Sequence, residues 1–168
     1  MVTLQLVSDT LTPELERMHR ALVDPGPVMR TIANVLDRGV KRNFRAEGRP
    51  TKWPRLAAST SGRKVTKGGK RRGSAHILRD TGRLIGSIQS RSGTFFAEIG
   101  TALVYAPAHQ FGTVRAGRSH NVKIPRRPFI GSSTQNPSEF RLVAEDERDA
   151  IRAIDAHILG RSFIRLGG

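Results

Sequence analysis

The stretch Pro27–Ala46, PVMRTIANVLDRGVKRNFRA, has the clearest helical pattern in the chain and decides its fold. Pro27 suits the first turn of a helix, and Gly48 with Pro50 suits the residues just beyond its end. We therefore expect a long amphipathic helix that packs one face against the rest of the protein. The apolar residues of that face recur at spacings of three and four: Val28, Ile32, Val35, Leu36, Val40 and Phe44.

One further helix is expected on each side of this stretch. Upstream, Thr12 and Pro13 are typical of an N-cap and a first helical position, and Asp24 with Pro25 marks the end. Downstream, the pattern predicts a helix from about Ala144 to Leu159, with an acidic first turn that the helix dipole favours. Three isoleucines share one face of this last helix: Ile151, Ile154 and Ile158.

The region between these helices contains short strand patterns. Ser87–Gln89 and Phe95–Gly100 predict a β-hairpin that turns through Arg91–Gly93, and Val122–Ile124 predicts another strand. We expect an α+β fold in a single domain of 168 residues, with N-terminal helices and a C-terminal helix packed on a small antiparallel sheet. Other short elements are expected: a strand in Met1–Ser8, a helix near Arg79–Ile85, a short turn or helix at Tyr105–Phe111, and a turn at Asn136–Ser138.

Positive charge dominates the composition and is concentrated in the middle of the chain. The sequence has 29 Lys and Arg against 14 Asp and Glu, a net charge of +15. Residues 41–127 hold 20 of the basic residues and only three acidic ones, so this region alone carries +17. Such a charge predicts an anionic partner, most simply nucleic acid.

The segment Ser59–Ser74, STSGRKVTKGGKRRGS, is too polar to bury itself, and we expect a long basic loop over about residues 58–76. Three interpretations stay open: an arm that contacts DNA, a segment that orders on assembly, or a solvated loop. Because no aromatic residue lies among the cations, any DNA contact is expected to be with phosphates, without sequence preference. The cations concerned are Arg63, Lys64, Lys67, Lys70, Arg71 and Arg72.

The sequence lacks the motifs of several kinds of catalytic and metal-binding site. Without cysteine there is no disulfide, Cys-ligated metal site or thiol nucleophile, and no apolar run approaches the 18 or so residues of a membrane span. The phosphate-loop spacing fails because five residues separate Gly62 from Gly68, and the five histidines have no metal-ligand spacing. The N-terminus does not have the pattern of a secretory signal. We predict no enzyme activity, cofactor or metal.

Several short motifs, taken together in order, resemble the phage virion morphogenesis family, the tail completion proteins of Mu-like and related tailed phages. The resemblance covers about residues 25–160, and residues 132–143 look like an extra stretch within it. The motifs are Trp53-Pro54 with Leu56, Leu78–Leu84 (LRDTGRL) with Ser87-Ile88, Ile99–Thr101, Tyr105-Ala106, His109–Thr113 (HQFGT) and Ile124–Gly131 (IPRRPFIG).

The resemblance implies a non-enzymatic virion protein at the head–tail junction, assembled in the host cytoplasm. Related neck proteins form rings, commonly hexamers, so it implies self-association and contact with neighbouring connector and tail-terminator or tail-tube proteins. Genomic DNA would pass through the lumen, and no membrane is involved. In such a ring the summed positive charge favours either DNA in the lumen or acidic neighbouring rings as counter-charge.

The Ile124–Gly131 motif also suggests an interface. Pro125 and Pro128 bracket two arginines in a stiff, extended segment that is able to lie across a neighbour. The candidates for a contact with another subunit or ring are Phe111, Arg126, Arg127, Phe129 and Ile130. The alternative is that Phe111, Phe129 and Ile130 are core residues of a monomer.

A different class of protein also stays open, a cellular basic protein that binds nucleic-acid phosphates through residues 59–74.

Overall fold

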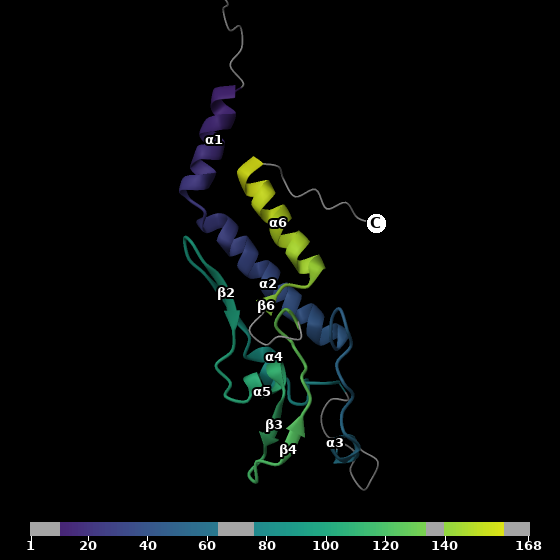
Figure 1. Ribbon diagram of the computed structural model, residues 1–168. Helices are drawn as coiled ribbons and strands as arrows, with labels where there is room; N and C mark the ends of the chain where they lie inside the picture. The colour runs from purple at the N-terminus through teal and green to yellow at the C-terminus, as the bar shows by residue number, and fades with distance from the viewer. Residues whose placement is uncertain (1–10, 64–75, 134–139, 160–168) are drawn as a thin grey trace, which may run out of the picture.

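The computed structural model describes residues 11–63, 76–133 and 140–159. Helix α2 (Gly26–Ala46) runs through the middle of an elongated molecule (Figure 1). Helix α6 (Ala144–Leu159) lies on one side of it, and the hairpin of β1 (Gln89–Ser92) and β2 (Ala97–Gly100) lies on the other. Helix α1 (Leu11–Val23) extends from one end. The predicted α+β class is confirmed.

Helix α2 follows the sequence pattern closely. Most of the predicted apolar face is buried, with Phe44 completely inaccessible. The helix ends as predicted, because Glu47 adopts a left-handed conformation (φ 53°) and Gly48 follows at φ 110°. A Cβ on Gly48 would lie 2.5 Å from the carbonyl oxygen of Thr51, so only glycine fits this turn.

The core is built around Phe44 from three distant parts of the chain. The ring of Trp53 meets Phe44 edge-on at 5.7 Å, and the ring of Phe129 lies 5.6 Å from Phe44. The indole N–H of Trp53 donates to the carbonyl oxygen of Pro128 (2.9 Å). Leu84 and Ala106 complete the same cluster. Several residues of the motifs quoted above are therefore core residues.

The strands form three separate two-stranded antiparallel sheets rather than the one small sheet expected. In the first, β1 pairs with β2 from Gln89↔Gly100 to Ser92↔Ala97. The short helix α5 (Ala106–Phe111) separates it from the second, in which β3 (Thr113–Ala116) pairs with β4 (Val122–Ile124). The third joins β5 (Ser132–Ser133) to β6 (Phe140–Arg141). Each pair is local, and no strand within the described part of the chain bridges them.

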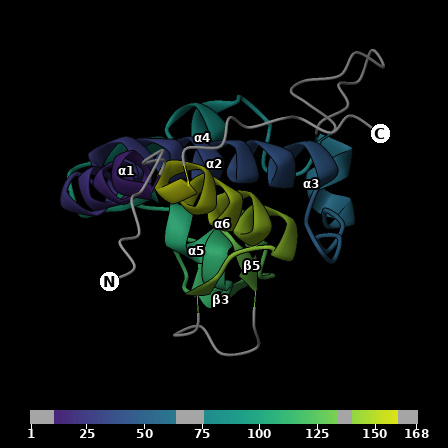
Figure 2. The same ribbon diagram turned by 90° about the horizontal axis from the view of Figure 1, so that it is seen from above.

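The short elements differ from expectation mainly at their ends. Helix α5 forms where a turn or helix was expected, and strand β4 is confirmed, whereas β3 was not predicted. Helix α4 (Arg83–Gly86) covers only the end of the expected helix, and it lies on the opposite side of α2 from α6 (Figure 2). The β1–β2 turn uses residues 93–96, where the N–H of Gly93 donates to the carbonyl oxygen of Phe96 (2.9 Å). The expected strand at 1–8 and turn at 136–138 lie outside the described residues.

Helix α6 has the predicted bounds, but a different face of it is buried. It packs on α2 through Asp146, Ala150 and Ala153, whereas Ile151 and Ile154 are 50% and 38% exposed. The reason is the close approach of the two helices, since a Cβ on Gly39 of α2 would lie 2.6 Å from Oδ2 of Asp146. Only small residues fit such a contact.

Ion pairs hold the start of α6 on α2. The buried carboxylate of Asp146 accepts hydrogen bonds from Arg42 (2.5 Å) and Arg49 (2.8 Å). Arg42 also pairs with Asp149 (3.0 Å). Burial alone would lower the pKa of Arg42, but the neighbouring carboxylates outweigh this effect and raise it. The other end of α6 is held to α1 by His157, whose Nε2 lies 3.0 Å from the carbonyl oxygen of Ala21.

None of the helices described here has both the length and the hydrophobicity that a membrane span requires.

Candidate interaction surfaces

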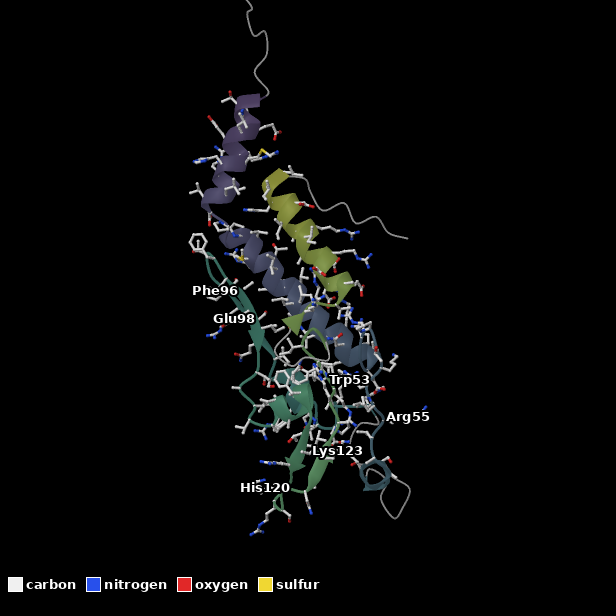
Figure 3. All side chains as sticks on the ribbon, in the orientation of Figure 1. Trp53, Arg55, Phe96, Glu98, His120 and Lys123 are labelled. Atoms are coloured by element: carbon white, nitrogen blue, oxygen red, sulfur yellow. The ribbon has the colours of Figure 1, made fainter. Side chains whose placement is uncertain are left out.

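The β3–β4 hairpin forms a basic end of the molecule. Its tip turns through Gly117 (φ 78°) and His120 (φ 51°), whose N–H donates to the carbonyl oxygen of Gly117 (3.1 Å). The sequence has no acidic residue from 99 to 138, so nothing within this region neutralises the hairpin. Arg55 lies in the same half of the molecule (Figure 3). We call the hairpin the basic hairpin, with exposed cations Arg115, Arg118 and Lys123.

A second surface, away from the basic hairpin, is apolar. Phe96 (Figure 3) and Phe95 lie in the β1–β2 turn. Phe95 is 78% exposed. This turn lies beside the α1–α2 junction, because a Cβ on Gly26 would be 4.0 Å from the Cα of Thr94. Leu22 and Val23 at the end of α1 are also exposed. These four apolar side chains, which we call the apolar tip, leave a surface that favours contact with another molecule.

A groove of about 510 Å³ lies between α2, β2 and α5, and we call it the α5 groove. Four of the five predicted interface residues meet there, namely Phe111, Arg126, Ile130 and the buried Phe129. Phe111, the last residue of α5, is 49% exposed. The rest of the lining is mostly apolar and includes Leu36, Ile99 and Ala106, and its one acidic residue, Glu98, is paired with Arg91.

Gln110 builds one side of this groove by holding the segment 125–130 onto α5. Its Oε1 accepts hydrogen bonds from the N–H groups of Phe129 (3.0 Å) and Ile130 (3.1 Å), and its Nε2 donates to the carbonyl oxygen of Ile130 (2.9 Å). Gly112 allows the close approach, because a Cβ there would lie 3.0 Å from the nitrogen of Arg126. The segment therefore lies along an element of its own subunit.

Arg127 and Phe129 point into the protein. Arg127 is 6% exposed, and its guanidinium donates to the carbonyl oxygens of Pro54 and Arg55, both at 3.0 Å. Burial lowers the pKa of Arg127. Phe129 is 1% exposed, so it is not the exposed anchor that its motif suggested. Successive side chains of an extended segment alternate between two sides, which is why Arg126 faces the groove instead.

His109 of α5 lies beside this buried arginine. Burial lowers the pKa of His109, and the positive charge of Arg127 lowers it further. The ring of Tyr105 meets the His109 ring edge-on at 5.9 Å. The imidazole is therefore kept neutral and serves as packing between α5 and the 125–130 segment.

The cations of the predicted basic loop are mostly outside the described residues. Arg63 ends the short helix α3 (Ala58–Arg63), so the first part of the expected loop is helical. Lys64, Lys67, Lys70, Arg71 and Arg72 fall in the undescribed stretch 64–75. Whether these cations contact DNA stays a prediction.

Sequence reasoning missed the basic hairpin and the apolar tip. The acid-free run of residues 99–138 was a signal for the first. Adjacent phenylalanines at 95 and 96 were a signal for the second, since neighbouring side chains of a strand cannot both face one core.

Comparison with known proteins places these features in a family. The chain matches the model of the phage virion morphogenesis family over residues 5–147, which runs from before α1 into the first turn of α6. It is 35% identical over 139 residues to the Mu-like prophage FluMu G protein 2 of Haemophilus influenzae, a match that covers 83% of this chain and 87% of that protein. No solved structure matches the chain. On these two matches, the protein belongs to the phage virion morphogenesis family.

Proposed function

We propose that this protein is a non-enzymatic structural component of the virion neck, which joins the DNA-filled head to the tail. The observation that carries the proposal is the family match over residues 5–147, together with the Mu-like prophage relative. The family match, and not the basic charge, favours this role over the alternative of a cellular nucleic-acid-binding protein.

We further propose that the protein acts as a ring, with six copies around the DNA channel. A neck ring has to contact copies of itself, a connector on one side, and a tail-terminator or tail-tube protein on the other. The shape of the subunit supports this, because its apolar tip and its basic hairpin are well separated along an elongated molecule (Figure 3). Surfaces of unlike chemistry suit unlike neighbours.

The basic hairpin is the described element best suited to genomic DNA in the lumen. Arg115, Arg118 and Lys123 are exposed, and no ion pair within the described residues involves them. Contact would be with phosphates, would depend steeply on salt, and would not depend on sequence. An acidic neighbouring ring is the other partner that this charge fits.

Deletion of the gene from the phage tests the proposed function. Electron microscopy of the lysate should show DNA-filled heads lying apart from finished tails, and wild-type protein supplied from a plasmid should restore joined particles. Normal infectious particles without the protein would contradict the proposal. Particles that stop before DNA packaging, or tails that are never finished, would assign the protein to a different step of morphogenesis.

A further inference from the structure

The α5 groove contains a cation without a partner. Arg126 lines the groove and forms no ion pair with any residue that the structure describes. Its Nε is fully buried and has no hydrogen-bond acceptor. The Arg126 side chain as a whole is only partly buried, and a carboxylate is the strongest acceptor for a guanidinium. The groove therefore suits a segment that presents apolar side chains next to a carboxylate.

The outer side of α6 presents such a segment. Ile151 and Ile154 are exposed at helical spacing, with Glu147 one turn before them and Asp155 beside them. We call these four residues the outer stripe of α6. They lie on one side of the helix, next to the face that packs on α2.

The carboxylates of the outer stripe are also unpaired. The other three acidic residues of α6, which are Glu145, Asp146 and Asp149, all pair with arginines of the same subunit. Neither Glu147 nor Asp155 has an ion-pair partner among the residues described. The chain thus carries an apolar groove with a free cation and an apolar stripe with free anions.

We propose that the outer stripe of α6 from one copy docks into the α5 groove of the next copy, with Arg126 paired to a carboxylate of the stripe. This inference rests on the proposed ring and names the contact that closes it. The isoleucines enter the apolar part of the groove, beside Phe111 and Ile130. Apolar burial then supplies most of the affinity, and the ion pair supplies the register.

The arrangement of the elements makes this a contact between copies. No residue of α6 lines the groove of its own subunit. Strand β2, which forms one wall of the groove, and α6 lie on the two sides of α2 (Figure 1). Because the two mating surfaces differ, an open assembly of any length keeps one free groove at one end and one free stripe at the other, and their contact closes a ring.

A second copy fits the groove better than an unrelated partner because the chain supplies the complementary charge itself. Helix α6 holds five of the 14 acidic residues of the whole sequence, whereas the segment that carries Arg126 lies in the acid-free run 99–138. An acidic protein of a neighbouring ring is the alternative occupant, and the experiments below distinguish the two.

Disulfide trapping tests the contact directly, because the natural chain has no cysteine. Phe111→Cys places a thiol at the groove and Ile154→Cys places one in the stripe. Under mild oxidation the full-length double variant should form a ladder of cross-linked multimers that ends at the copy number of the ring. Each single variant should stay monomeric on the gel, because a groove meets only a stripe. Purified protein at rising concentration and assembled particles should both be examined.

A mixing experiment supplies a second readout. Phe111→Asp with Arg126→Glu blocks the groove, and Ile151→Asp with Ile154→Asp blocks the stripe. Each blocked variant alone should sediment as a monomer, whereas their mixture should form a one-to-one pair and nothing larger, because only one good groove and one good stripe remain. Leu15→Asp, which adds a negative charge at an exposed apolar site on α1 outside the apolar tip, is the matched control and should assemble as the wild type does. Circular dichroism should show that all variants are folded.

The outcomes separate this inference from the proposed function. If wild type assembles and both blocked variants still assemble, the docking inference is wrong and the ring proposal survives. Cross-linking of either single variant to itself would replace the head-to-tail contact with a symmetric one. A double-cysteine variant that stays monomeric in solution and in particles would overturn the inference, and trapping of a different virion protein at Phe111→Cys would identify a neighbouring ring as the occupant. The role at the head–tail junction depends on the deletion phenotype alone.

Discussion

The side-chain amide of Asn43 donates hydrogen bonds to the carbonyl oxygens of Phe129 (3.0 Å) and Gly131 (3.2 Å), 86 and 88 residues further along the chain. Asn43 is completely buried, and its Oδ1 accepts a hydrogen bond from Nε of Arg49 (2.9 Å). One polar side chain of α2 thus holds the strip of chain that forms the groove.

Replacement of Asn43 by alanine should destabilise the protein strongly. Two buried carbonyl oxygens and the Nε of Arg49 would lose their partners, at a cost of roughly 1–3 kcal/mol for each buried group left unpaired. The free energy of unfolding, measured by urea denaturation, should fall accordingly. Asn34→Ala, at an exposed position on the same helix, should change it by less than about 0.5 kcal/mol. Equal effects of the two substitutions would contradict the role of Asn43.

Gly39→Ala should separate α6 from α2. The added Cβ would meet Oδ2 of Asp146 at 2.6 Å, and the ion pairs of that carboxylate leave it little room to move. We expect a loss of about 1–3 kcal/mol, as for other overpacked sites, measured as a lower urea midpoint. Gly86→Ala is the matched control, because nothing lies within 4 Å of a Cβ there. A neutral effect at position 39 would mean that the helices are less closely packed than described.

Stability should decrease in mild acid because of His109. Burial and the charge of Arg127 lower the pKa of His109 in the folded protein, so the unfolded chain binds a proton more readily. Stability is then greatest above the unfolded pKa of about 6.5 and falls as the pH is lowered through that value towards the folded pKa. Urea midpoints from about pH 7.5 to about pH 5 should show a shallower decline for His109→Gln than for wild type. His19→Gln, on exposed α1, should retain the wild-type decline.

The basic hairpin should contribute to DNA binding in proportion to its charges. Replacement of Arg115, Arg118 and Lys123 by glutamine should weaken binding to duplex DNA of any sequence. The slope of log affinity against log salt should decrease by about 0.9 for each phosphate that the variant no longer neutralises. Fluorescence anisotropy with two unrelated duplexes measures both. The control replaces Arg30, Arg148 and Arg152, which are exposed elsewhere, and an equal weakening there would show that only net charge matters.

The long helices could be predicted from sequence because their signals are local. The bounds of α6 match the expected helix, and α2 begins within one residue of Pro27. The β1–β2 turn lies at residues 93–96 and not at Arg91–Gly93, where the sequence predicted it. Phe95 is typical of a strand, yet its ring lies in solvent at the tip. The division into three sheets had no local signal, since it depends on how segments far apart pack on α2.

The interaction surfaces were less predictable than the helices. An extended segment requires Arg126 and Arg127 to face opposite ways, but the inward one is selected by carbonyl oxygens of Pro54 and Arg55, over 70 residues away. On α6, hydrophobicity favours the isoleucines as the buried face. The close contact at Gly39 instead buries two alanines and an aspartate, which only the assembled fold reveals.

The alternation along residues 126–130 has a consequence for how a phage protein of this kind can diverge. Arg127 and Phe129 are buried, whereas Arg126 and Ile130 line the groove with partly accessible side chains, and Gln110 fixes the strip through its backbone atoms alone. Substitution at 126 or 130 alters what the groove accepts while the hydrogen bonds that define its shape remain. Under the docking proposed above, copies from competing phages in one host become mutually incompatible by changes at a few positions, without any change of fold.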